Sequence, residues 1–417
     1  MKNKVIGSLL PSLIICFFLI VATFFPVTTS SQERNGGSIN KGCHCIYGTI
    51  QDDESLEFLD IDNVVREVLP PTWDWRDIDG EDWTTPIKNQ FQEICGSCWA
   101  FGSLAGLESM VKIWENNSAL DVDLSEQYML SCSPGDCGGW YWQQTLNWIK
   151  YNGAIPEDCL PYEADDTIPC DDKCPEWRDL LIGIDDYHKV SSNVSLIQSA
   201  LIEHGPLPAT MDVYEDFYPN YTGGVYQYTY GNFVFGHCVT IVGYNDSWGD
   251  PDEGYWIVKN SWGTDWGEDG WFRIAYGECR IENGVYYFTG PNYPAEKPEK
   301  PSGPTSGKPG EEYTYSSRAI DPDEDTIKYC FDWGDDNSSW SGFVSSGEPV
   351  SLSYIWEEKG TYEVKVKVQD EHGLESDWSD PLTVTMPFNN DLIKNPLLLN
   401  FLETFHRLYS IYKYNSR

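Results

Sequence analysis

Residues 95–101 have the composition of a site for nucleophilic catalysis. They read Cys-Gly-Ser-Cys-Trp-Ala-Phe, so Cys98 follows a Gly-Ser turn and opens a run with helical spacing. A cysteine in the first turn of a helix has its thiolate, the reactive form, stabilised by the helix dipole and by exposed backbone amides. The alternative is a C-x-x-C redox or zinc pair formed by Cys95 and Cys98. Such a pair needs two further zinc ligands or a βαβ pattern, and neither is evident nearby.

His237, one of 6 histidines in the chain, has the setting expected of a catalytic base. A thiolate nucleophile needs a base, and the base needs a group that orients it. His237 directly precedes the apolar run 238–244, and Asn260 closes another apolar run. A neutral amide fixes the imidazole without adding a third charge to a thiolate–imidazolium pair, and Trp262 would shield that hydrogen bond from water. A single histidine before a strand is more often structural, but its combination with Cys98 and Asn260 favours catalysis.

Two helices and three strands are predicted to position these residues. A helix is predicted over 98–114, where apolar residues recur at helical spacing, and a second over 124–132 has Ser125 as a suitable N-cap. Strand patterns follow at 238–244, 255–259 and 270–274. A helical first half and a β-rich second half predict an α+β unit of two lobes over residues 70–290.

Length and charge limit the class of protein. A chain of 417 residues has room for two or three domains. Its formal net charge of −39 argues against a nucleic-acid partner, because a polyphosphate needs basic neutralisation. A strongly acidic, solvated surface is expected to keep such a protein soluble and monomeric.

Residues 1–30 have the layout of a signal peptide, with Lys2 and Lys4 before an apolar run that gives way to small polar residues at 28–31. The sequence therefore predicts export with cleavage and a secreted, extracellular product. The alternative is a retained N-terminal anchor, because about 20 apolar residues can span a bilayer. The 13 cysteines suit an oxidising compartment.

The remaining segments differ in composition. Residues 31–69 are polar and acidic and are predicted to be a short pro-region, which makes the protein a zymogen. Residues 291–310, rich in Pro, Gly, Ser and Lys, are predicted to be a linker. Residues 311–387 hold short alternating segments separated by turn signals, which predicts a small β-sandwich. Residues 388–417 form an apolar tail of helical period, either a docking helix pair or an anchor.

Several stretches resemble the papain family of cysteine peptidases and follow that family's order. They lie at residues 85–90, 95–101, 124–127, 236–244 and 259–272. The resemblance implies a two-lobed papain-like fold, with a helical lobe and a β-barrel-like lobe. It also implies cysteine peptidase activity on protein or peptide substrates, without a cofactor.

The resemblance assigns a role to each residue of the site. It implies Cys98 as nucleophile, His237 as base and Asn260 as the group that orients the base. It also implies an oxyanion hole formed by the Cys98 amide and a glutamine side chain. Gln90 holds the family's place after Lys-Asn, whereas Gln92 has the usual distance to Cys98. Gln90 is preferred, and Gln92 stays open.

The same resemblance describes the surroundings of the cleft. Gly138 and Gly139 would bind substrate backbone by strand addition, and Trp262 is assigned to substrate binding as well. Trp140 and Tyr141 would form an apolar subsite, or else belong to the core.

The resemblance also bears on the cysteines. The implied disulfides are Cys95–Cys137 and Cys132 with either Cys170 or Cys174. Cys238 replaces the small residue that usually follows the catalytic histidine. It is expected to be a buried free thiol without a catalytic role.

Residues 321–325, 329–335 and 360–364 resemble a sandwich of the polycystic-kidney-disease (PKD) type, a module common behind extracellular hydrolases. Such a module would space the enzyme or attach it to a surface or substrate. The acidic loop from Asp321 to Asp325 offers oxygen ligands for Ca²⁺. The alternative is a solvated acidic loop, and no other metal is predicted.

Together these observations predict a secreted cysteine endopeptidase that works through a thioester acyl-enzyme. Endopeptidase action is preferred because no second histidine pair that could cap the cleft is found. One alternative is a catalytically silent peptide-binding or adhesion protein, which the retention of both nucleophile and base disfavours. The other is a transpeptidase, which forms the same acyl-enzyme and differs only in the attacking group.

Overall fold

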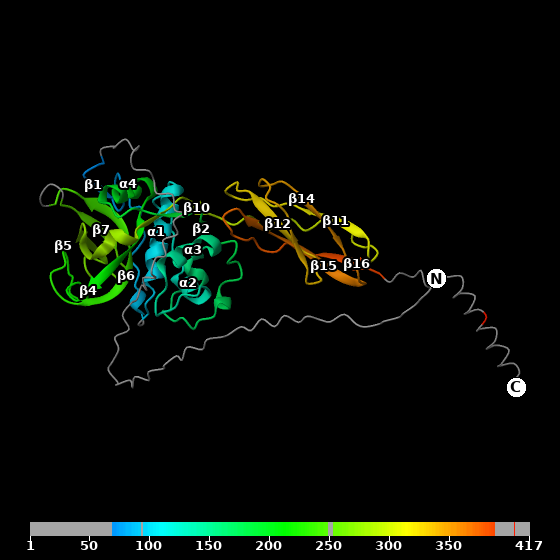
Figure 1. Cartoon of the computed structure of the whole chain (residues 1–417), viewed down its shortest axis with the longest axis horizontal. Helices are drawn as coiled ribbons and strands as arrows, with labels where there is room; N and C mark the ends of the chain where they lie inside the picture. The colour runs from blue at the N-terminus through cyan, green and yellow to red at the C-terminus, as the bar shows by residue number, and fades with distance from the viewer. Residues whose placement is uncertain (1–68, 93–94, 249–252, 388–403, 405–417) are drawn as a thin grey trace, which may run out of the picture. The chain divides into compact units, whose positions relative to one another are not determined.

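In the described residues, one large hydrophobic core lies below residue 290 and another above it, and a smaller cluster includes Tyr128 and Leu160. The computed structural model describes residues 69–92, 95–248, 253–387 and 404 (Figure 1). The predicted signal peptide, the pro-region up to residue 68 and the apolar tail apart from Thr404 lie outside these residues. Within the described part, no helix combines the length and the apolar character needed to cross a membrane.

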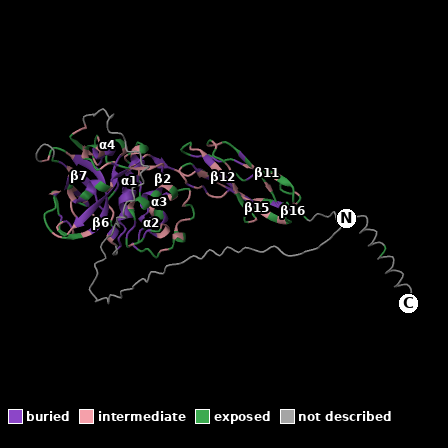
Figure 2. Ribbon diagram, viewed as in Figure 1, coloured by how far each residue is buried: buried purple, intermediate pink, exposed green. Residues whose placement is uncertain are grey.

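Helix α1 (Cys98–Trp114) forms the centre of the first unit and has the bounds that the apolar spacing predicts. Every residue from Cys98 to Lys112 is buried, and Figure 2 shows the buried residues gathered around this helix and strand β6. The other helices are α2 (Glu126–Cys132), α3 (Trp142–Asn152) and α4 (Val194–His204). Ser125 caps α2 as predicted, because its Oγ accepts the Tyr128 amide at 2.9 Å.

A six-stranded sheet forms the second half of this unit. Its strands are β1 (Thr72–Asp74), β4 (Leu207–Tyr214), β5 (Val225–Tyr226), β6 (Phe233–Asn245), β7 (Tyr255–Lys259) and β8 (Trp271–Ala275). Strand β6 pairs antiparallel with β1, β4 and β7, and β5 lies parallel to β8. The predicted strand 238–244 is the second half of β6, the predicted strand 255–259 coincides with β7, and the predicted strand 270–274 begins one residue before β8.

Short elements complete the unit. Two-stranded sheets pair β2 (Gly183–Ile184) with β10 (Pro291–Asn292), and β3 (Tyr187–Lys189) with β9 (Tyr286–Phe288). Four 3₁₀ turns lie at η2 (Gln90–Gln92), η3 (Glu157–Cys159), η4 (Cys170–Asp172) and η5 (Glu278–Gly284). The predicted α+β class is confirmed.

The second unit is the predicted small β-sandwich. One sheet pairs β11 (Glu312–Ser317) with β14 (Val350–Ile355). The other has the order β13 (Ser338–Trp340), β12 (Ile327–Asp332), β15 (Gly360–Asp370) and β16 (Leu382–Met386). Alternating residues of β15, Val364, Val366 and Val368, point into a core that also holds Trp333 and Trp356.

The predicted linker differs from the structure, because its residues pack onto the sandwich. Ala295 belongs to the sandwich core and is 4% exposed. The Ser302 amide donates to the Ser316 carbonyl at 2.8 Å, and the Gly307 amide donates to Thr385 at 3.2 Å. Proline and glycine are common in linkers, but here they run along the edges of the two sheets, where some amides need no partner strand.

Candidate active site

His237 and Asn260 form a buried hydrogen-bonded pair. His237 Nε2 lies 2.7 Å from Asn260 Oδ1, and the two side chains are 0% and 3% exposed. An amide oxygen only accepts, so Nε2 carries the proton and donates it. His237 Nδ1 has no hydrogen bond in the described part of the chain. This leaves Nδ1 as the basic atom of the neutral ring.

Trp262 covers this pair. Its ring stacks on the His237 imidazole with centroids 4.6 Å apart and an interplanar angle of 26°, and only 6% of the side chain is exposed. Asn260 is held in turn, because its Oδ1 also accepts the Ser261 amide at 2.8 Å. Exclusion of water strengthens the His237–Asn260 bond, which is the shielding that the sequence predicts for Trp262.

His237 sits inside strand β6, whereas the sequence places it before a strand. It lies opposite Met211 of β4 in the antiparallel register. Gly236 interrupts the apolar pattern in the sequence, so the predicted strand begins after it. In the structure β6 already begins at Phe233 and runs through this glycine. The ring is thus fixed by a central strand.

Cys98 is the first residue of α1, carries a thiol and is 0% exposed. Ser97 occupies the N-cap position without a side-chain cap. Its Oγ instead lies 2.7 Å from the Tyr162 hydroxyl, so it takes none of the first-turn amides. Those amides and the positive end of the helix dipole therefore favour negative charge at Cys98.

Close packing of α1 against β6 brings the nucleophile and the base to one region. A side chain at Gly102, one turn after Cys98, would lie 2.9 Å from the Val239 amide nitrogen. Thr240 Oγ1 donates to the Gly102 carbonyl at 2.9 Å. Glycine at this position allows the helix to approach the strand that carries His237.

Gln90 is the glutamine that the structure fixes beside the site. It is 0% exposed, and its Nε2 donates toward the Cys95 carbonyl at 3.4 Å. Its Oε1 accepts the Ser261 hydroxyl at 2.6 Å, which leaves the amide NH₂ turned toward the Cys95–Cys98 turn. The side chain of Gln92 lies outside the described residues, so Gln90 stays the preferred oxyanion donor.

Replacing Gln90 with alanine is expected to lower kcat by about 10²–10³ with little change in KM. The reason is that an oxyanion donor acts in the transition state more than in substrate binding. Steady-state kinetics on a fluorogenic peptide measures both constants. The same substitution at the exposed Gln143 is the control. A loss that falls mainly on KM would mean that Gln90 binds substrate rather than the oxyanion.

Disulfides fix the loops around the nucleophile. The structure holds Cys95–Cys137 and Cys132–Cys170, the pairs that the resemblance implies, and a third bridge that it does not imply, Cys159–Cys174. The expectation of a free thiol at Cys238 is wrong. Cys238 is disulfide-bonded, and its partner is none of the cysteines in the described ranges. Its burial next to the base was compatible with either state, and sequence alone does not give connectivity.

The glycine pair lies on the loop tied to the nucleophile by the first bridge. Gly139 has φ +108°, a conformation that a side chain would strain. Gly138 is exposed, and its amide donates to Asp136 Oδ1 at 2.7 Å. Gly139 is buried and its amide donates to the Asp136 carbonyl at 3.0 Å, so both amides of the pair are bonded within the loop, and substrate binding by this pair stays a prediction.

Trp140 does not line an open subsite. It is 8% exposed and packs edge-on against Trp99 with centroids 5.3 Å apart. This corresponds to the alternative of a core aromatic residue. Tyr141, in contrast, is 41% exposed.

A buried charge cluster lies beneath the site, between α1, α2 and β7. Lys88 Nζ is 2.9 Å from Glu108 Oε1 and 3.0 Å from Glu126 Oε1. The two carboxylates share the ammonium of Lys88. Burial raises the pKa of Glu126 to about 8. Burial also disfavours the Glu108 carboxylate, but Lys88 and Lys259 outweigh it and lower the Glu108 pKa.

The free energy of unfolding is expected to fall as the pH rises from about 5 to 8. The folded state holds the Glu126 proton that the unfolded chain releases near its ordinary pKa of 4.5. That stabilisation is complete below pH 4.5 and is lost as the pH approaches 8. Denaturant unfolding at several pH values tests this, with Glu126→Gln as the comparison. The variant should flatten the profile; an unchanged pH slope would contradict the assignment.

The first unit also matches a known family. The sequence model described as "Papain family cysteine protease" matches residues 69–289, more than half of the chain. The chain belongs to the papain family of cysteine proteases. A match to the model described as "PKD domain" covers residues 295–386, so a papain-type protease domain is followed by a C-terminal PKD domain.

The chain is also similar to individual proteins. Cathepsin B-like CP1 of Giardia intestinalis is 36% identical over 235 residues, which is 52% of this chain and 73% of that protein. Cathepsin B-like cysteine proteinase 3 of Caenorhabditis elegans is 35% identical over 255 residues, covering 53% of this chain and 66% of its own. A solved digestive procathepsin L2 from Tenebrio molitor is 31% identical, covers 54% of this chain and 69% of its own, and has a TM-score of 0.43.

Proposed function

We propose that this papain-family protease is an exported endopeptidase with Cys98 as nucleophile, His237 as acid–base and Asn260 as orienting residue. The observation that carries the proposal is the buried His237–Asn260 hydrogen bond of 2.7 Å. It leaves Nδ1 of the ring for proton transfer with a thiol at the N-terminus of α1. Gln90 and the Cys98 amide complete the oxyanion hole.

The reaction follows from these positions. The Cys98 thiolate attacks the substrate carbonyl carbon, and the oxygen that gains the electron pair is stabilised by the Gln90 and Cys98 donors. Protonated His237 gives its Nδ1 proton to the leaving amine, and a thioester to Cys98 remains. Water then attacks this thioester while His237 takes one of its protons, which releases the acid and restores the Cys98 thiolate beside protonated His237.

Two further features support the finer parts of the proposal. Three disulfides among the described residues suit an oxidising compartment and therefore export. Of the other histidines in this unit, His188 and His204 both lie against Tyr287. These ring contacts support the proposal that neither histidine acts at the cleft as an exopeptidase would need.

The test is the position of the cuts made by the matured, reduced protein in an unfolded protein substrate of known sequence. Mass spectrometry should show internal cleavage sites that disappear when the thiol is blocked. Removal of dipeptides from one end only would contradict the endopeptidase proposal. Addition of a peptide amine separates hydrolysis from transfer, because an amine-capped product as the main outcome would identify a transpeptidase. Binding without any cleavage would identify a silent binder.

A further inference from the structure

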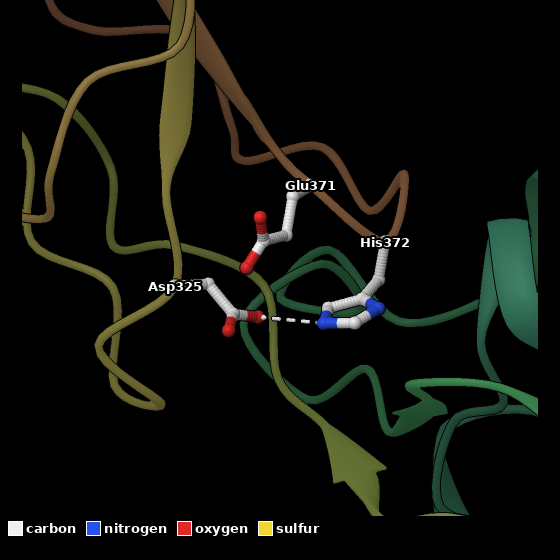
Figure 3. Close-up of side chains that lie close together, drawn as sticks. All are labelled: Asp325, Glu371 and His372. Atoms are coloured by element: carbon white, nitrogen blue, oxygen red, sulfur yellow. Dashed lines mark ion pairs between the residues drawn. The ribbon is translucent and has the colours of Figure 1, made fainter.

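Three side chains of the PKD domain converge from two different loops. Asp325 precedes β12, and Glu371 and His372 follow β15. Their ligand atoms all lie within 4.8 Å of one another (Figure 3). The convergence follows from the pairing of β12 with β15, in which Ile327 lies opposite Asp370.

His372 is held in the tautomer of a metal ligand. Its Nδ1 lies 3.0 Å from the Asp185 carbonyl oxygen, which can only accept, so Nδ1 carries the proton in the neutral ring. The lone pair is therefore on Nε2, which faces Asp325 Oδ2 at 3.5 Å. A backbone carbonyl on the second ring nitrogen is the usual support of a metal-binding histidine.

The carboxylates of Asp325 and Glu371 also have oxygens that are available to bind a cation. Thr326 Oγ1 donates to Glu371 Oε2 at 2.8 Å, which fixes that group and leaves its other oxygen. Asp325 Oδ2 is buried and makes no hydrogen bond within the described ranges. The same holds for Oδ2 of the neighbouring Asp321, which is 2% exposed. A cation between these groups would supply the partner that the two buried oxygens lack among the described residues.

We propose that Asp325, Glu371 and His372 bind a divalent transition-metal ion of the Zn²⁺ class. Zn²⁺ binds both imidazole nitrogen and carboxylate oxygen, and a site of three protein ligands with water in the fourth position is an established arrangement for this ion. The bound ion would tie the loop before β12 to the turn after β15.

The acidic loop predicted for Ca²⁺ is the weaker site. Asp321 Oδ1 already accepts the amides of Asp323 and Asp325, at 3.0 and 3.2 Å. Asp323 Oδ2 accepts the Tyr293 amide at 2.7 Å. Ca²⁺ takes six to eight oxygen ligands, so it would need all the carboxylate oxygens of Asp321, Asp323 and Asp325. These hydrogen bonds already occupy some of those oxygens.

Equilibrium dialysis of the full chain against Zn²⁺ tests the proposal, with Cys98→Ala as the parent so that the catalytic thiol binds no metal. His372→Gln and Glu371→Gln should each bind one equivalent less than this parent. Asp323→Asn is the matched control, because it removes a neighbouring negative charge and no ligand of the triad. It should bind as the parent does, and an excess of Ca²⁺ should not displace the ion.

A thermal unfolding scan provides the second measurement and reports whether each variant folds. Zn²⁺ should raise the Tm of the parent and of Asp323→Asn, and should not shift a folded His372→Gln. Equal Zn²⁺ stoichiometry in parent, His372→Gln and Glu371→Gln would overturn the proposal. So would a loss in Asp323→Asn equal to that in His372→Gln, since it would indicate general attraction to an acidic surface.

Discussion

Replacing Cys98 with alanine is expected to lower kcat for peptide hydrolysis by about 10⁴–10⁶, because no other group can form the thioester. The substitution removes one sulfur atom from a buried position at the start of α1 and leaves the helix intact. The fold should therefore persist, and substrate should still bind. Hydrolysis of a fluorogenic peptide and binding of an uncleavable analogue measure the two effects separately.

The matched control is Cys330→Ala. Cys330 is also a buried thiol, 3% exposed, but lies in β12 of the PKD domain. Its loss should leave kcat unchanged. If the Cys98 variant kept more than about a hundredth of the parent rate, where nucleophile removal costs far more, the assignment of the nucleophile would be wrong.

Replacing His237 with alanine is expected to have an effect of similar size, because the thiol then has no base and the leaving amine no proton donor. Groups that act as a unit are not additive. The double variant, Cys98→Ala with His237→Ala, should therefore be about as inactive as either single one.

His188→Ala controls for the loss of an imidazole. His188 lies in β3 with its ring 5.2 Å from Tyr287, outside the site. That variant should keep the parent's rate. Losses that multiply in the double variant would contradict the Cys98–His237 pair, since they would mean that the two residues act independently.

Local patterns were enough to predict the elements that hold the site. The apolar spacing after Cys98 gives the bounds of α1, and the strands that carry His237 and precede Asn260 follow from apolar runs. The predicted bounds of a strand were wrong where a glycine interrupts the apolar pattern, as Gly236 does within β6. A glycine weakens the strand pattern in sequence, but the register with β4 carries the strand through it.

Features that depend on tertiary packing could not be predicted from local sequence patterns. Composition marks residues 291–310 as a linker, yet Ala295 is part of the sandwich core. The sequence around Trp140 does not show whether its side chain faces substrate or the interior. Its contact with Trp99 in the structure places it in the interior. The bridge of Cys159 with Cys174 and the bonded state of Cys238 depend on the distances between chain segments, which cysteine spacing does not give.

The central claim is that peptide cleavage proceeds through a covalent intermediate on Cys98. The most direct measurement is acid quenching of the matured enzyme during turnover of a slow peptide ester, followed by mass spectrometry of the digested protein. We expect one acyl group, attached to the Cys98 sulfur, that decays at the rate of product release and is absent in the Cys98→Ala variant. Turnover with no acyl group on Cys98, or with the acyl group on another residue, would contradict it.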